Sequence, residues 1–144
     1  MRERQDRVES DLQNFENQAE QAEEKMQQVE QAIEQIEAAI SRLQSSDDHE
    51  VAGSLQRNLA QKQQEKAQVQ QEAQQIASQI EGALNQVHEI NQLNQQANSE
   101  VSALTSIGED VGDALSIIQQ RESWVQEKEN RCRELQQRLQ SIGS

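Results

Sequence analysis

The sequence predicts an all-α fold: an elongated antiparallel coiled coil whose three helices run up, down and up, forming a rod with two-helix hairpin tips. Apolar residues recur at steps of three and four along most of the chain, which places them on one narrow seam of each helix. The chain contains no proline and five glycines, and turn-forming residues cluster at only two places. We expect a single elongated helical domain over residues 1–144.

The first helix is expected over about residues 3–44. After it, Ser45, Ser46, Asp47 and Asp48 interrupt the apolar pattern, and Asp47 with Glu50 suits a capping pair for the next helix. The seam of the first helix contains Val8, Leu12, Phe15, Ala19, Ala22, Met26, Val29, Ile33, Ile36, Ile40 and Leu43.

The second helix is expected over about residues 50–105 and the third over about 110–142. Gly108, in the turn between them, suits the end of a helix. The seam of the second helix contains Leu55, Leu59, Lys62, Lys66, Val69, Ala73, Ile76, Ile80, Ala83, Val87, Ile90, Asn94, Ala97, Val101 and Leu104. The seam of the third contains Val111, Ala114, Ile118, Arg121, Val125, Lys128, Cys132, Leu135, Leu139 and Ile142.

Four polar seam residues are candidates for setting the helix register: Lys62, Lys66, Asn94 and Arg121. Polar residues at core positions of coiled coils commonly specify register and partner number at some cost in stability. Lys62 and Lys66 are expected to reach carboxylates of the first helix, most directly Glu30 and Glu37. Contact with a partner protein is the alternative role for this group.

Antiparallel neighbours should pair residues whose numbers add to a constant. A sum of 95 aligns the seams of the first two helices, and a sum of 215 aligns those of the second and third. The first and third helices are then parallel with an offset of 120. This register predicts a three-helix segment from about residues 5–22, 73–90 and 125–142, and a second helix roughly 80 Å long.

The charge balance bears on possible partners and location. The formal net charge is -13, with 13 basic and 26 acidic residues, which argues against nucleic-acid binding. The polar N-terminal region and the lack of a long apolar run predict a soluble protein with neither a secretory signal nor a membrane span. The single Cys132 suits a reducing compartment, so we expect a cytoplasmic location, with signal-independent export as the open alternative.

The spacing of reactive residues predicts no enzyme, metal site or cofactor. His49 is expected in a turn, His88 on an outward face, and Cys132 in the core as a small apolar residue. No segment combines a serine or cysteine nucleophile with a nearby base. Gly108 and Gly112 do not form a phosphate-binding loop.

A line of acidic residues follows the seam of the first helix: Glu9, Glu16, Glu23, Glu30 and Glu37. A solvated helix face is one interpretation of this line. The alternative is a surface for a basic partner helix, which would make association dependent on salt.

Five apolar residues that lie off the narrow seam form the predicted apolar tip of the second hairpin: Leu93, Ile107, Leu115, Ile117 and Trp124. A two-helix hairpin cannot cover them all, so they are candidates for partner binding or self-association. Leu93 and Trp124 could instead close the end of the three-helix segment near Met1 and Arg4.

These observations favour a non-catalytic helical interaction protein that acts as a scaffold, spacer or adaptor, and a homo-oligomer is expected. A secretion-associated protein, either an exported substrate or a chaperone for a client helix, is the alternative function. Small helical-hairpin substrates of bacterial specialised secretion carry a Trp-x-Gly turn, which this chain lacks, since its first turn reads Ser45-Ser46-Asp47-Asp48-His49.

Overall fold

The computed structural model describes residues 1–143 and confirms the all-α fold class. Three helices account for nearly all of these residues: α1 (Arg2–Ser45), α2 (His49–Ser106) and α3 (Gly112–Gly143). Each helix begins and ends within two residues of the bounds expected from the apolar pattern. The described part of the chain contains no strand.

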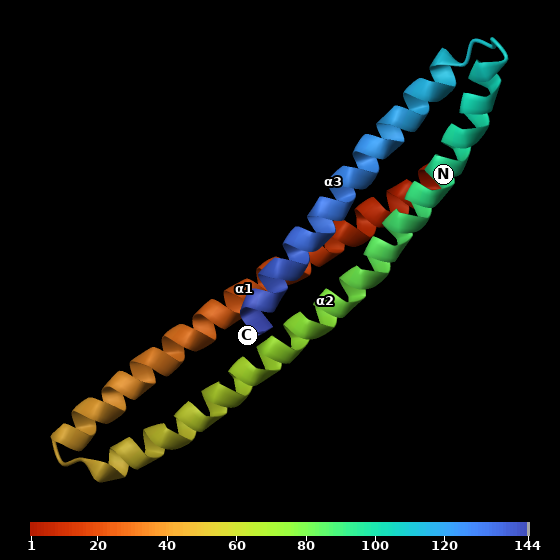
Figure 1. Ribbon diagram of the computed structural model, residues 1–144. Helices are drawn as coiled ribbons and strands as arrows, with labels where there is room; N and C mark the ends of the chain where they lie inside the picture. Colours follow the sequence, from red (N-terminus) through yellow and green to blue (C-terminus); the bar gives the residue numbers. More distant parts are fainter. Residues whose placement is uncertain (144) are drawn as a thin grey trace. The chain divides into compact units, whose positions relative to one another are not determined.

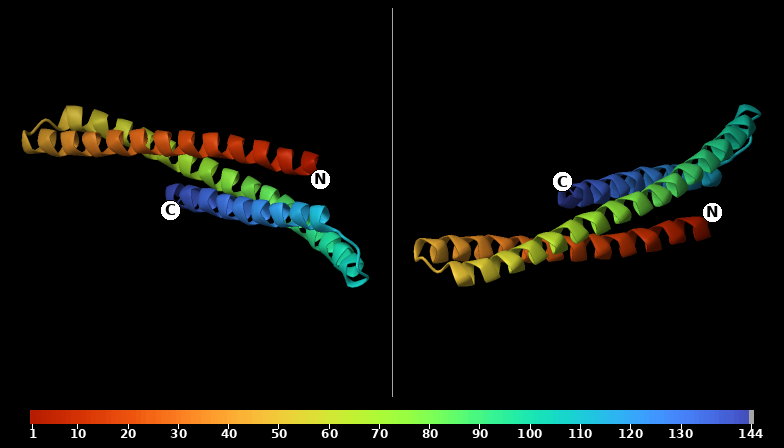
Figure 2. Two further views of the ribbon diagram at one scale, coloured as in Figure 1. Left: turned by 90° about the horizontal axis from the view of Figure 1, so that it is seen from above. Right: turned by 90° about the horizontal axis from the view of Figure 1, so that it is seen from below.

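The chain divides into two compact units. Unit 1 consists of Met1–Glu16 and Ser78–Gln137, and unit 2 consists of Asn17–Ala77 with the described residues from Arg138 onward. In unit 2, α2 runs beside α1, and in unit 1 it runs beside α3 (Figure 1). Figure 2 shows from two further sides that α2 and α3 stay together up to the turn at residues 107–111. A single domain over the whole chain stays a prediction.

The seam predicted from the apolar spacing forms the helix interfaces. In α1 and α3 every seam residue is buried or half-buried, including Val8, Ala19 and Leu139, which have no exposed surface. In α2 the same holds from Leu55 to Val101, whereas Leu104 is 44% exposed. Burying this narrow apolar stripe is the main stabilising contribution to the helices, because their remaining faces are polar.

Polar contacts between the helices agree with the predicted register to within a few residues. The ion pairs Arg4–Glu89, Lys25–Glu72 and Lys66–Glu30 join α1 to α2, and their residue numbers add to 93, 97 and 96, against the expected 95. The contacts Asn94–Ile118, His88–Glu129 and Glu81–Gln136 join α2 to α3, with sums of 212, 217 and 217, against the expected 215.

The turn after α1 differs from the expected capping pattern by one residue. Asp47 has a φ of 61°, a left-handed conformation that ends the preceding helix. Asp48, rather than Asp47, caps α2, because its Oδ1 accepts a hydrogen bond from the backbone N–H of Val51 at 3.2 Å. The Asp47 carboxylate instead lies 2.8 Å from Nε2 of His49.

The turn after α2 follows the expected chemistry. Gly108 has a φ of 88°, a conformation that is unfavourable for residues with a Cβ atom, and the N–H of Glu109 bonds to the carbonyl of Leu104. Asp110 Oδ1 accepts a hydrogen bond from the N–H of Gly112 at 3.2 Å, at the start of α3. This turn positions the apolar residues at the end of the hairpin.

Candidate functional site

The predicted apolar tip lies in unit 1, at the end of the α2–α3 hairpin. Ile107 in the turn is 74% exposed, Ile117 on α3 is 49% exposed, and Leu93 on α2 is 38% exposed. Leu115 is half-buried. Three of the five predicted tip residues therefore present apolar surface that the chain itself leaves uncovered.

Trp124 has a different environment. It is half-buried, and its indole Nε1 donates a hydrogen bond to Oε1 of Glu9 on α1 at 2.8 Å. The same carboxylate lies 3.8 Å from the ammonium of Lys128. The alternative interpretation placed both Leu93 and Trp124 near Met1 and Arg4. Trp124 packs beside α1 with Glu9 as its polar partner, whereas Leu93 is 38% exposed.

Leu104 is an exposed apolar residue that we placed on the seam. Its expected partner, Val111, precedes the first residue of α3, so no helical turn lies opposite Leu104. The position of Leu104 in the last full turn of α2 was the available signal, because terminal turns of a hairpin lack a complete set of neighbours. Leu104 joins Leu93, Ile107 and Ile117 as exposed apolar surface of one hairpin.

Asn94 is the most buried polar residue of the seam. It is 1% exposed, and its Nδ2 donates a hydrogen bond to the backbone carbonyl of Ile118 at 3.0 Å. Its Oδ1 has no hydrogen-bond partner in the structure. Arg121, expected in the same layer, is half-buried one turn further along α3. The hydrogen bond from the side-chain amide of Asn94 therefore links α2 to one particular backbone carbonyl of α3.

The two seam lysines, Lys62 and Lys66, are half-buried in unit 2. One pairs with a carboxylate of α1 and the other with a carboxylate of its own helix. Lys66 lies 3.8 Å from Glu30 on α1, as expected. Lys62 instead lies 3.1 Å from Glu65 in its own helix rather than beside Glu37. A long flexible side chain can reach several carboxylates, and the one three residues along the helix lies within its range.

Basic residues of α3 form ion pairs with part of the acidic line on α1. Glu16 pairs with Arg131, and Oε1 of Glu23 lies 2.5 Å from Nη2 of Arg138. Together with the Glu9–Trp124 bond, these contacts repeat every seven residues on both helices and join positions 115 apart. We did not predict these pairs from the sequence, although Trp124, Arg131 and Arg138 share the heptad spacing of Glu9, Glu16 and Glu23.

The thiol of Cys132 is fully buried in unit 1, as its seam position predicts. Burial, followed by the charge of Glu81, raises its pKa from 9.0 to about 11. Because the thiolate is the reactive form, this cysteine is poorly suited to nucleophilic chemistry. Across residues 1–143, no three histidine, cysteine, aspartate or glutamate side chains lie close enough together to hold a metal ion.

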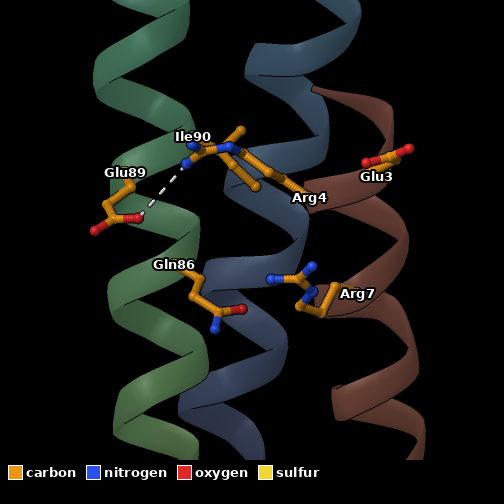
Figure 3. Close-up of a pocket in the computed structure, with 6 residues that line it drawn as sticks. All are labelled: Glu3, Arg4, Arg7, Gln86, Glu89 and Ile90. Atoms are coloured by element: carbon orange, nitrogen blue, oxygen red, sulfur yellow. Dashed lines mark ion pairs between the residues drawn. The ribbon is translucent and has the colours of Figure 1, made fainter.

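A shallow groove of about 350 Å³ lies in unit 1 between the first turns of α1 and residues 86–90 of α2. Arg4 and Arg7 extend from α1 toward α2, where Glu89 lies 3.7 Å from Arg4 (Figure 3). Gln86 and Ile90 complete the α2 side of the groove. These residues supply guanidinium, carboxylate, amide and alkyl groups to the groove.

Within residues 1–143, no helix contains a stretch both long enough and apolar enough to span a membrane. Comparison of the chain with known protein families, with curated proteins and with solved structures gives no match.

Proposed function

We propose that this chain is a non-catalytic helical interaction protein, a scaffold, spacer or adaptor that binds protein through the end of its α2–α3 hairpin. The observation that carries this proposal is the exposure of large apolar side chains in one hairpin: Leu93, Leu104, Ile107 and Ile117. Clustered apolar surface of this kind commonly marks a protein interface, because leaving it in water is unfavourable.

The chemistry of the remaining residues supports a binding role. The one thiol is buried and protonated, and the groove beside Arg4 and Arg7 offers charged and amide groups without a nucleophile. A free, buried cysteine also suits the reducing cytoplasm, where we place the protein. A partner protein and a second copy of the chain are both possible ligands of the exposed hairpin end.

Site-specific photocrosslinking in the cells that produce the protein tests this proposal. A photoreactive amino acid replaces Ile107, and the matched control replaces Gln63, which is exposed on α2 in unit 2. We expect an adduct at position 107 that is absent at position 63. An adduct of twice the chain mass indicates self-association, and an adduct of another mass indicates a partner. Equal labelling at the two positions, or no adduct at position 107, overturns the proposal.

A further inference from the structure

The face of α2 that contacts α1 in unit 1 continues as an apolar surface beyond the first turn of α1. Arg4 pairs with Glu89, and Gln86 lines the same groove. Leu93 follows Glu89 by four residues and Gln86 by seven, so it lies on the same face of α2. Leu104 follows Leu93 by eleven residues, or about three turns, and returns to this face.

The face of α3 that contacts α1 continues in the same way. Trp124 bonds to Glu9, and Arg131, seven residues later, pairs with Glu16. Ile117 precedes Trp124 by seven residues and therefore lies on the same face of α3. It is 49% exposed, whereas Trp124 is half-buried beside α1. Trp124 therefore lies where α1 faces α3, whereas Ile117 lies where no helix of the described residues faces it.

Leu93, Leu104 and Ile117 are exposed apolar residues on neighbouring faces of α2 and α3, and we use the name open groove for the surface that these three residues form. Figure 1 shows α2 and α3 continuing past the N-terminal end of α1 to their connecting turn. Along this stretch, no other helix of the described residues covers the hairpin. The distance from Leu93 to Leu104 along α2 is about 17 Å, which is enough for about three turns of a helix in the position that α1 occupies further along.

The other hairpin of the chain provides an internal comparison. In unit 2, the end of the α1–α2 hairpin also consists of two helices, yet Val51 is its only exposed large apolar residue among those described. The end of a two-helix hairpin in this chain therefore does not necessarily expose several leucine and isoleucine side chains. The open groove is a specific property of the α2–α3 hairpin.

The charges around the open groove distinguish between possible ligands. The charged residues within 91–120 are Glu100, Glu109, Asp110 and Asp113, and the nearest basic residue of the hairpin is Arg121, which follows Ile117 by four residues at the α1 end of the groove. Glu100 follows Leu93 by seven residues and so lies on the groove face. A second hairpin end would bring like charges together, whereas a basic segment would complement them.

We propose that the open groove binds a basic amphipathic helix of a partner protein, which takes the third-helix position beside α2 and α3. This inference rests on the proposed function and names the chemistry of its partner. Apolar residues of the bound helix pack against Leu93, Leu104 and Ile117. Its lysine or arginine side chains pair with Glu100 and with Asp113 at the start of α3.

Binding to the full chain can be measured with a designed peptide, because Trp124 is the only tryptophan and lies at one end of the open groove. The probe is a helical peptide of about 14 residues with leucine at heptad positions a and d, lysine elsewhere, and a dansyl group that accepts energy from Trp124. A matched peptide carries glutamate in place of lysine. We expect the basic peptide to bind at least about tenfold more tightly than the acidic one.

Substitutions separate groove binding from general attraction to an acidic protein. Leu104→Ser combined with Ile117→Ser should weaken binding of the basic peptide by about tenfold or more, because both apolar contacts are lost. The matched control Val51→Ser should leave binding unchanged. Glu100→Gln with Asp113→Asn should weaken binding and reduce its dependence on salt. Circular dichroism should show that each variant keeps its helices.

Several outcomes would overturn the inference. If the Leu104→Ser, Ile117→Ser variant binds the basic peptide as tightly as the wild type does, the peptide binds elsewhere. If both peptides bind equally tightly, or if neither binds, the ligand is not a basic helix. A wild-type dimer that this variant dissociates in light scattering would identify a second copy as the ligand. In each case, a persistent crosslink at position 107 would leave the proposed interaction function intact, whereas its absence would remove that function as well.

Discussion

The indole Nε1 of Trp124 on α3 donates a hydrogen bond to the carboxylate of Glu9 on α1, over 2.8 Å and 115 positions of the chain. This bond joins the third helix to the first within unit 1, beside the point where α1 begins. The residues of the predicted apolar tip therefore have two different environments. Trp124 packs against α1, whereas Ile117, one heptad earlier, is exposed.

Loss of the Glu9 carboxylate should loosen the contact between α1 and α3. We expect Glu9→Ala to lower the free energy of unfolding by about 0.5–1 kcal/mol, the usual net value of a partly exposed hydrogen bond. Trp124 emission should shift to longer wavelength as water reaches the indole. Urea unfolding followed by fluorescence measures both effects. Glu20→Ala, at an exposed carboxylate of the same helix, should change neither.

The buried thiol predicts a pH dependence of stability in the alkaline range. Burial raises the pKa of Cys132 from 9.0 to about 11. Because the folded state holds this proton more tightly than the unfolded chain does, the resulting stabilisation is complete below pH 9 and is lost as the pH rises toward 11. Urea unfolding at about pH 8 and about pH 10.5 should therefore show a larger loss for the wild type than for Cys132→Ala. Equal losses would contradict the assignment.

Asn94 should cost stability while it selects one register. Its buried Oδ1 has no hydrogen-bond partner, and such a group is unfavourable compared with an alkyl group of similar shape. We expect Asn94→Leu to raise the free energy of unfolding by about 1–2 kcal/mol. Thermal unfolding provides the measurement, and Asn85→Leu, on an exposed face of α2, is the control expected to change little. A marked loss of stability in Asn94→Leu would show that the bond to Ile118 outweighs the unpaired oxygen.

The sequence correctly predicted the burial of residues whose position on the helix surface follows from the heptad spacing of a single helix. The buried positions of Val8, Leu139 and Cys132 follow from the heptad alone, and so does the burial of Asn94. Salt-bridge partners follow only in part, since Lys66 lies beside Glu30 as predicted. Lys62 lies beside Glu65 of its own helix, because a flexible side chain selects among several nearby carboxylates whose energies differ little.

At the ends of helices, too, the heptad spacing was not enough to predict which side chains are exposed. Leu104 keeps the seam spacing but is 44% exposed, since α3 begins only at Gly112 and no turn faces it. Trp124 shows the opposite case, an off-seam residue covered by α1. The off-seam apolar residues predicted an exposed tip, but which of them are accessible depends on which of them face α1 within unit 1.

Two glycines of unit 1 should respond in opposite directions to a methyl group. Gly108 has a φ of 88°, so Gly108→Ala should lower the free energy of unfolding by about 1 kcal/mol through backbone strain alone. Gly82 lies inside α2, where an added Cβ atom would meet nothing within 4 Å beyond the backbone of its own helix. Gly82→Ala should therefore raise stability by about 0.5–1 kcal/mol through its better helix propensity. Thermal unfolding of the two variants checks both signs.

The ion pair between Glu16 and Arg131 should contribute more to stability than the exposed pair between Lys25 and Glu72. The Glu16 side chain is 17% exposed, whereas those of Lys25 and Glu72 are 58% and 52% exposed. Lower exposure reduces screening by water and salt, so the attraction between the charges is stronger. A double-mutant cycle of alanine variants should give a coupling energy of about 1 kcal/mol for the first pair and under about 0.5 kcal/mol for the second.

Salt provides a further check on the same two cycles. The coupling of the exposed Lys25–Glu72 pair should vanish at about 1 M salt, where the screening length falls to about 3 Å, while part of the Glu16–Arg131 coupling persists. Equal coupling energies at low salt, or equal loss at high salt, would mean that the side chain of Glu16 is as well hydrated as those on the surface. In that case the contacts repeated along α1 and α3 would follow from the packing of the helices without selecting their register.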